Sequence, residues 1–210
     1  MKKLFTILLL SLTLPFAALA SEFEQGKHYD VIANPNSSAK PEVVEFFSFY
    51  CPHCANFEPI AQQLEQQLPA GSSFTKMHVD FMRAAPAELQ NNLARAFLAA
   101  DRQGKKHQVI DAIFQHIHGK RESFTSPDQI RQVAIDAGAD ASAYDADINS
   151  FAVINAADFM KQQQNKYTAQ GVLSGVPMLI VNGKYKINFQ HLEGDFAAEL
   201  TKLVNYLLEK

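Results

Sequence analysis

Cys51 and Cys54 are the only cysteines of the chain, and Pro52 and His53 lie between them. A structural disulfide stabilises most when it closes a long loop, and a bridge between these two would close almost nothing. A zinc site needs about four ligands, and no second cysteine pair supplies them. The spacing therefore favours reversible thiol–disulfide exchange, in which one thiol resolves a mixed disulfide made by the other.

The segments around the cysteines predict where the thiols lie. Residues 42–50, EVVEFFSFY, are β-branched, aromatic and apolar on both faces, which is typical of a strand buried within a sheet. After them, apolar residues recur at helical spacing from Pro52 onward. Cys51 would thus begin a helix, where unpaired N–H groups and the macrodipole favour a thiolate. A protonated His53 would add to this effect, so we predict a low Cys51 pKa and a pair that donates its disulfide.

The first twenty residues have the pattern of an export signal. Lys2 and Lys3 precede an apolar run, Leu4 to Phe16, and Ala18-Leu19-Ala20 forms a small-x-small cleavage site. We therefore expect a signal peptide over 1–20 and a mature chain that starts at Ser21. Without the two lysines, 19 − 2 = 17 basic residues face 22 acidic ones, a net charge of −5. With no basic cluster, we expect no nucleic-acid partner.

The remaining periodicity predicts a sheet interrupted by helices. Residues 84–166 have helical periodicity throughout, and the glutamines at 162–164 are interpreted as a solvated helix face. His116 and His118 lie two residues apart and would diverge on a helix, so no metal site is expected. Further strands are predicted in 26–32 and 73–81, a pair of strands joined at Asn182-Gly183 in 177–188, and a final helix over 196–208.

Three parts of the sequence together resemble the DsbA family of bacterial thiol:disulfide oxidoreductases, in the thioredoxin superfamily. They are the leader with EFFSFYCPHC, the later GVPMLIVNGKY, and the helical stretch between them. The CPHC motif is more specific than a bare Cys-x-x-Cys. The resemblance implies an α/β thioredoxin fold with an inserted all-helical domain. After the 1–20 leader, residues 21–83 and 167–210 would form the thioredoxin-like domain, and 84–166 the insertion.

The resemblance also implies an activity and its partners. The Cys51–Cys54 disulfide would be donated to reduced, newly exported proteins in the periplasm, promoting their oxidative folding. No soluble cofactor and no metal would be needed. Reoxidation would come from a DsbB-like, quinone-linked membrane protein, and the chain is expected to be a monomer.

Several further residues receive roles through the resemblance. Pro177 matches a cis-proline that faces the active-site disulfide, and the backbone of Val176 would pair with the substrate chain. Glu45 would lie beneath the site near Lys76 and assist proton transfer at Cys54, with Glu58 as a weaker electrostatic contributor. The alternative is that Glu45 is exposed at an edge or merely paired with a lysine. The segment 188–196 is shorter than is usual in the family, so no groove residues are carried over.

Two other functions stay open at this point. A disulfide isomerase or reductase would use the same thiols, although isomerases of this superfamily commonly dimerise through an added domain that is not visible here. A peptide-binding chaperone with incidental cysteines is the alternative outside enzymes. A scrambled-disulfide refolding assay separates an isomerase from an oxidase, and client binding without the thiols would identify a chaperone.

Overall fold

A computed structural model describes residues 22–33, 35 and 38–210, so the predicted signal peptide and its cleavage site lie outside the described residues. At the centre is a five-stranded mixed sheet with the order β1-β5-β4-β2-β3. Strands β2 and β3 are parallel, and the other neighbouring pairs are antiparallel. The strands are β1 (Tyr29–Val31), β2 (Glu42–Phe47), β3 (Ser73–His78), β4 (Met178–Val181) and β5 (Tyr185–Ile187).

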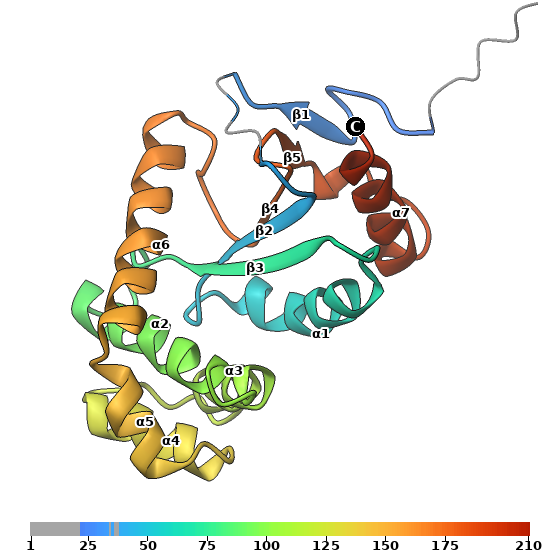
Figure 1. The fold of residues 1–210 in the computed structure, drawn as a ribbon. Coiled ribbons are helices and arrows are strands. Elements are labelled where there is room, and N and C mark those ends of the chain that lie inside the picture. Colours follow the sequence, from blue (N-terminus) through green and yellow to red (C-terminus); the bar gives the residue numbers. More distant parts are fainter. Residues whose placement is uncertain (1–21, 34, 36–37) are drawn as a thin grey trace, which may run out of the picture.

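One face of the sheet is covered by the first and last helices, α1 (Pro52–Gln67) and α7 (Phe196–Leu208), as Figure 1 shows. Their apolar residues, among them Leu64 and Leu203, pack with Val43 and Leu179 of the sheet in one buried cluster. A short 3₁₀ helix, Phe189–His191, connects β5 to the α7 side. No helix within the described ranges is both long and apolar enough to cross a bilayer.

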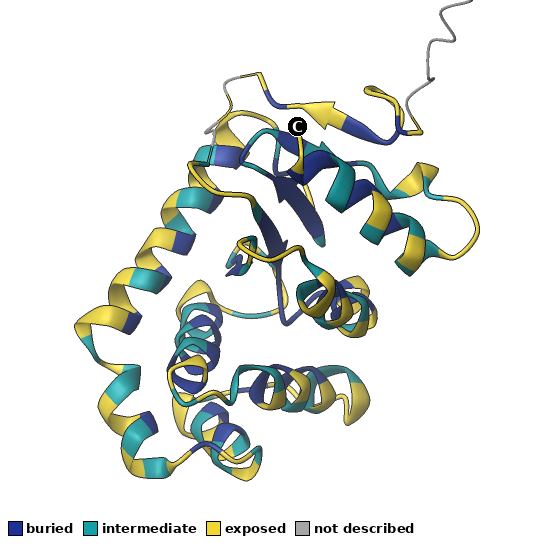
Figure 2. Cartoon of the chain, turned by 45° about the vertical axis from the view of Figure 1, so that its right-hand side comes forward, coloured by how far each residue is buried: buried dark blue, intermediate teal, exposed yellow. Residues whose placement is uncertain are grey.

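The other helices all lie between β3 and β4 in the sequence and gather beside the sheet (Figure 1). A π-helical turn, Gln115–Gly119, continues helix α3 (Lys106–Phe114). Ser126 caps helix α4 (Pro127–Asp136) by accepting a hydrogen bond from the Gln129 N–H. Burial is concentrated on their inward sides and on the strands, which Figure 2 shows in dark blue. These helices are α2 (Ala87–Asp101), α3 (Lys106–Phe114), α4 (Pro127–Asp136), α5 (Ala141–Ile148) and α6 (Phe151–Ala169).

An aromatic cluster joins the end of β2 to the inserted helices. The Phe47 ring lies 5.1 Å from that of Phe49 and 5.7 Å from that of Phe97 on α2. Phe49 in turn lies 5.1 Å from Phe114 at the end of α3. Because edge-to-face rings at these distances attract one another beyond their burial, the cluster fixes the segment that leads into Cys51.

The predicted elements agree with the structure where the sequence signals are local. The final helix has the predicted bounds, and Asn182-Gly183 forms the turn between β4 and β5 with φ of 54° and 62°. The strands near 26–32 and 73–81 are confirmed but shorter than the predicted segments. The domain boundaries stay predictions, and α6 is continuous across residues 166 and 167.

The interpretation of residues 162–164 as a solvated face is wrong for Gln164. Its side chain is buried and bonds Asp80 twice, just beyond β3. The Asp80 N–H donates to Gln164 Oε1 at 2.8 Å, and Gln164 Nε2 donates to Asp80 Oδ1 at 2.8 Å. Gln164 therefore ties α6 to the sheet.

Replacing Gln164 with Ala should destabilise the protein, because the Asp80 N–H loses its partner. An unsatisfied buried donor costs about 1–3 kcal/mol, to be measured as a fall in the free energy of unfolding in urea. Gln162→Ala, at an exposed position of the same helix, is the control and should stay within about 0.5 kcal/mol of the parent. Equal effects of the two substitutions would contradict this role for Gln164.

Candidate active site

The cysteines lie where β2 passes into α1, as predicted. Cys51 is the N-cap of α1, with φ −97° and ψ 113°, and Pro52 occupies the first turn, where its missing N–H costs nothing. The Cys54 N–H donates to Cys51 Sγ at 3.3 Å. Both cysteines are free thiols and are 3% and 0% exposed. Cys51 thus takes the place of the capping side chain that α1 would otherwise need.

The two thiols have opposite acidities. The side-chain hydrogen bond from Cys54 is the largest cause that lowers the pKa of Cys51, to about 6; the N–H groups of Cys54 and His53 and the charge of His53 lower it further, against burial. The same hydrogen bond and burial raise the pKa of Cys54 far above its ordinary value. His53 itself is exposed on the first turn. The site therefore holds one thiolate near neutral pH, and Cys51 carries it.

The loop before β4 faces Cys51. The Val176–Pro177 peptide bond is cis, which confirms the expected isomer, and both residues are half-buried. The Cys51 thiol donates to the Val176 carbonyl oxygen at 3.3 Å. The structure thus brings together a cysteine and a backbone carbonyl that are 125 positions apart. The roles given to Val176 and Pro177 stay predictions.

Glu45 lies within the core and not at an edge. It is fully buried on β2 and stands opposite Lys76 of β3 in the sheet register. Lys76 Nζ donates to Glu45 Oε2 at 2.5 Å and to Glu58 Oε2 of α1 at 2.7 Å. The same Nζ lies 4.6 Å from the centre of the Phe47 ring. The family resemblance placed Glu45 near Lys76 and made Glu58 a weaker electrostatic contributor, but Glu58 bonds the same ammonium at a similar distance.

Glu45, Lys76 and Glu58 form a buried triad, and a proton on its Glu45 carboxyl group is exchanged near neutral pH. Burial is the main cause that raises the pKa of Glu45, to about 7; Lys76 opposes this, and Glu58 adds to it. Burial alone would lower the pKa of Lys76, but the two carboxylates raise it above its usual range, so the ammonium stays charged. The Glu45 charge also raises the pKa of Cys54. Glu45 can therefore exchange a proton near neutral pH, and its role at Cys54 stays a prediction.

The sequence analysis missed two histidines that hold the peptide just before the motif. The Phe49 N–H donates to His78 Nε2 at 3.2 Å, and the Phe49 carbonyl accepts from His118 Nε2 at 2.8 Å. Burial lowers the pKa of His78 to about 3, so its ring is neutral and can accept. His118 lies on the π-helical turn, whose altered spacing no sequence period indicates.

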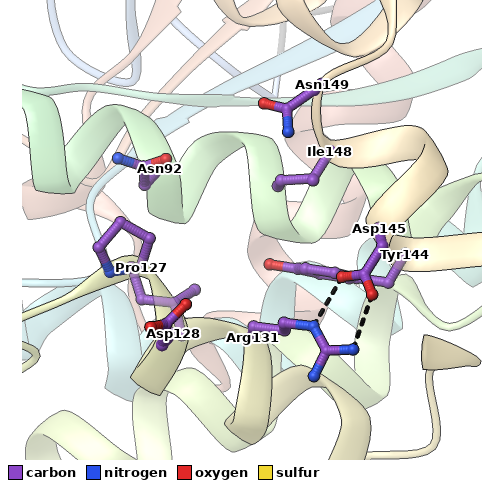
Figure 3. A pocket seen from close by; sticks show the side chains of 9 residues that line it. Asn92, Pro127, Asp128, Arg131, Tyr144, Asp145, Ile148 and Asn149 are labelled. Atoms are coloured by element: carbon purple, nitrogen blue, oxygen red, sulfur yellow. Dashed lines mark hydrogen bonds and ion pairs between the residues drawn. The ribbon is translucent and has the colours of Figure 1, made fainter. Parts of the chain in front are cut away.

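The described residues also line two cavities of interest. A groove of about 470 Å³ lies between residues 174–178, which include the cis-proline loop that faces Cys51, and residues 186–191. A second cavity of about 220 Å³ lies among α2, α4 and α5, where Arg131 donates to the Asp145 carboxylate at 2.6 and 2.7 Å (Figure 3). None of the predicted site residues lines the second cavity. The groove is therefore the cavity that adjoins the predicted site.

No cluster of three or more His, Cys, Asp or Glu side chains that could hold a metal occurs in residues 22–33, 35 and 38–210.

Comparison with known proteins gives one family. Residues 42–199 match the model of the DSBA-like thioredoxin domain. The thiol:disulfide interchange protein DsbA of Escherichia coli K12 is 37% identical over the full length of both chains, and that of Salmonella typhimurium is 36% identical over the same coverage.

Solved structures agree with the sequence relatives. A complex of Proteus mirabilis DsbA with a non-covalently bound peptide, PWATCDS, has a TM-score of 0.76 and 34% identity, over 90% of this chain and 100% of that one. DsbA from Klebsiella pneumoniae has a TM-score of 0.78 and 27% identity, over 91% and 100% of the two chains. The predicted thioredoxin fold is thereby confirmed. By its full-length relatives, its fold and its CPHC pair, the chain belongs to the DsbA family and is a thiol:disulfide oxidoreductase.

Proposed function

We propose that this oxidoreductase works as an oxidase, with Cys51 as the sulfur that exchanges with clients and Cys54 as the inner thiol. The observation that carries the proposal is the position of Cys51 Sγ at the N-cap of α1, where the Cys54 side chain and N–H lower its pKa to about 6. A stabilised thiolate stabilises the reduced protein, so the oxidised protein gives its disulfide away readily.

In the first step a client thiolate attacks Cys51 Sγ of the enzyme disulfide. The bond between Cys51 and Cys54 breaks, a mixed disulfide forms, and Cys54 leaves as a thiolate. Because the pKa of Cys54 is raised, this thiolate takes up a proton at once. Glu45, with a pKa of about 7, supplies that proton and is later reprotonated from solvent.

In the second step another client thiolate attacks the client sulfur of the mixed disulfide. The client gains its disulfide, and Cys51 leaves with the electron pair as a thiolate. A thiol of low pKa is the better leaving group, so this step is favoured in the direction of the reduced enzyme. Two electrons pass from the client dithiol to the enzyme in these two steps. The two client protons go to solvent, and the enzyme takes up one proton, at Cys54 through Glu45, while Cys51 stays a thiolate near neutral pH.

Clients are held through their main chain, we infer, beside the cis-proline loop. In support, the Val176 carbonyl lies within hydrogen-bonding distance of Cys51, and the groove of about 470 Å³ continues from it. A relative with 34% identity has been solved with a bound peptide. Recognition of the backbone suits a broad range of reduced, unfolded proteins, because every client has the same main chain.

The compartment and the partner for reoxidation follow from the family resemblance. The oxidase would act as a monomer in the periplasm on newly exported proteins, after removal of residues 1–20. A DsbB-like, quinone-linked membrane protein would restore the Cys51–Cys54 disulfide. The redox-active pair would be the only redox group required, so no soluble cofactor takes part in this scheme.

Cys51→Ser should abolish oxidation of a reduced, unfolded dithiol peptide, because no sulfur remains to form the mixed disulfide. The measurement is the loss of free client thiols with time, beginning from oxidised wild type or from the variant. Asn56→Ser, at an exposed position of the same helix, is the control and should keep full activity. Substantial residual oxidation by the Cys51 variant would reject the assignment.

His53→Ser should raise the Cys51 pKa, because the imidazole charge that helps to stabilise the thiolate is lost, while the backbone N–H at position 53 remains. The variant should be a weaker oxidant in glutathione equilibrium. Ultraviolet absorbance of the thiolate, titrated against pH, measures the first effect directly. An unchanged titration curve in the variant would show that His53 does not tune the sulfur.

The reduced protein should become more stable than its Cys51→Ser variant as the pH rises. The folded-state pKa of Cys51 is about 6, below the ordinary value of 9.0, so folding favours the thiolate. This contribution is complete above about pH 9 and disappears as the pH falls through 6. Urea unfolding of both proteins from pH 5 to 9 under reducing conditions gives the difference. A difference that stays flat over this range would contradict the lowered pKa.

A further inference from the structure

The two carboxylates that share Lys76 do not have equal hydrogen-bond partners. Glu58 is satisfied at both oxygens, because Lys76 Nζ donates to Oε2 at 2.7 Å and Gln62 Nε2 donates to Oε1 at 3.1 Å. Glu45 accepts only at Oε2, from Lys76 at 2.5 Å. Its Oε1 is buried without a hydrogen-bond partner among the described residues.

Gln62 is held in a single orientation from two sides. It lies one turn after Glu58 on α1, and its Nε2 also donates to Asp111 Oδ1 of α3 at 2.9 Å. Both acceptors are carboxylate oxygens, so the Gln62 amide nitrogen gives one hydrogen to each of them. Helices α1 and α3 pack side by side at this point (Figure 1).

This asymmetry decides which carboxylate of the pair carries a proton. An ionised carboxylate is stabilised by each donor that it accepts from, whereas a buried oxygen without a donor is more stable when protonated. We propose that Gln62 is a positioning residue, which donates to Glu58 in its ionised form and so leaves the exchangeable proton of the pair on Glu45. The inference rests on the proposed role of Glu45 in the oxidase cycle.

Other charges around the site act equally on all variants of Gln62. On α1, Glu65 raises the pKa of Glu45 slightly, but it is paired with Lys106 of α3 at 2.7 Å and with His107 at 3.5 Å. From β3 the facing charge is Lys76, and Cys54 is the titratable thiol on α1. None of these groups bonds to the Gln62 amide, so a change at Gln62 removes only its donations to Glu58 and to Asp111.

The contact with Asp111 also makes the inserted helices part of the proton site. Gln62 would be free to turn away from Glu58 if only α1 held it, since its side chain is only half-buried. The Asp111 carboxylate on α3 holds the amide in place. The insertion thus contributes a fixed donor orientation to a site whose reacting groups all lie on the thioredoxin-like part.

The test is a carboxyl carbon titration by NMR of the reduced, full-length mature protein, with signals assigned through Glu45→Gln and Glu58→Gln. In the wild type the carboxyl group that titrates near 7 should be that of Glu45. In Gln62→Met the donor is lost at nearly constant size. The Glu58 midpoint should then rise and the Glu45 midpoint fall, each by about one pH unit.

One variant serves as the control. Gln63→Met changes the exposed neighbour and should shift neither midpoint. The pH dependence with which Cys54 releases glutathione from a mixed disulfide at Cys51 should move to lower pH only in Gln62→Met, in step with Glu45.

Either of two results would overturn the proposal: a wild type in which Glu58 titrates near neutral pH in place of Glu45, or a Gln62→Met variant with both midpoints unchanged. The titration is independent of client oxidation. If the carboxyl midpoints shift as expected but the protein does not oxidise dithiols, the proposed function is wrong and the role of Gln62 stands. If the protein oxidises dithiols but the carboxyl midpoints do not shift in Gln62→Met, only the role proposed for Gln62 is wrong.

Discussion

The chemistry of this protein depends on the stability of one sulfur anion at the beginning of α1. Cys51 accepts from the Cys54 N–H at 3.3 Å, in the position where a Ser or Asp side chain caps many other helices. The capping geometry does not require a thiolate, but it favours one, since the first-turn N–H groups are otherwise unpaired. The neighbouring elements serve to hold this junction still, through the Phe47 and Phe49 rings and the two histidines that bond the Phe49 peptide.

The buried charges of Glu45, Lys76 and Glu58 form an arrangement that is unfavourable for the stability of the fold. Glu45, Lys76 and Glu58 are nearly free of solvent, and two carboxylates compete for one ammonium. Removing such groups from water costs several kcal/mol per ion, which their attraction repays only in part. A hydrophobic trio would stabilise the sheet and α1 more simply. The role proposed for the triad, as the proton donor to Cys54, would account for this cost, because the pKa of Cys54 is itself strongly raised.

Local signals in the sequence predicted much of this arrangement. The apolar, β-branched run of residues 42–50, the Asn182-Gly183 turn and the CPHC motif before a helical pattern each depend on neighbours in the chain. The buried strand, the hairpin, the last helix and the capping position of Cys51 could therefore be predicted. The closeness of Glu45 and Lys76 came from the family resemblance. Gln164 and His118 were not predicted, because their partners lie 84 and 69 positions away. Gln62 has one partner four positions away and one 49 positions away, and only the packing of α3 against α1 brings the second to it. Such contacts depend on how the inserted helices pack, and a glutamine on a helix has the same appearance whether it faces water or a buried carboxylate.

The side chains of strand β2 are buried on both faces of the sheet, in two different clusters. Glu45 points toward α1 and Lys76, while its neighbours Val44 and Phe46 belong to the opposite cluster, in which the Phe46 ring meets that of Tyr167 at 5.4 Å. Successive side chains of a strand alternate between faces, so inserting or deleting a single residue upstream of Glu45 would exchange the two sets. A carboxylate would then enter the aromatic core, and a phenyl ring would replace it beside the ammonium. The length of this strand is consequently under stricter constraint than most of its individual side chains, and variation among homologues should accumulate as substitutions there and as indels elsewhere.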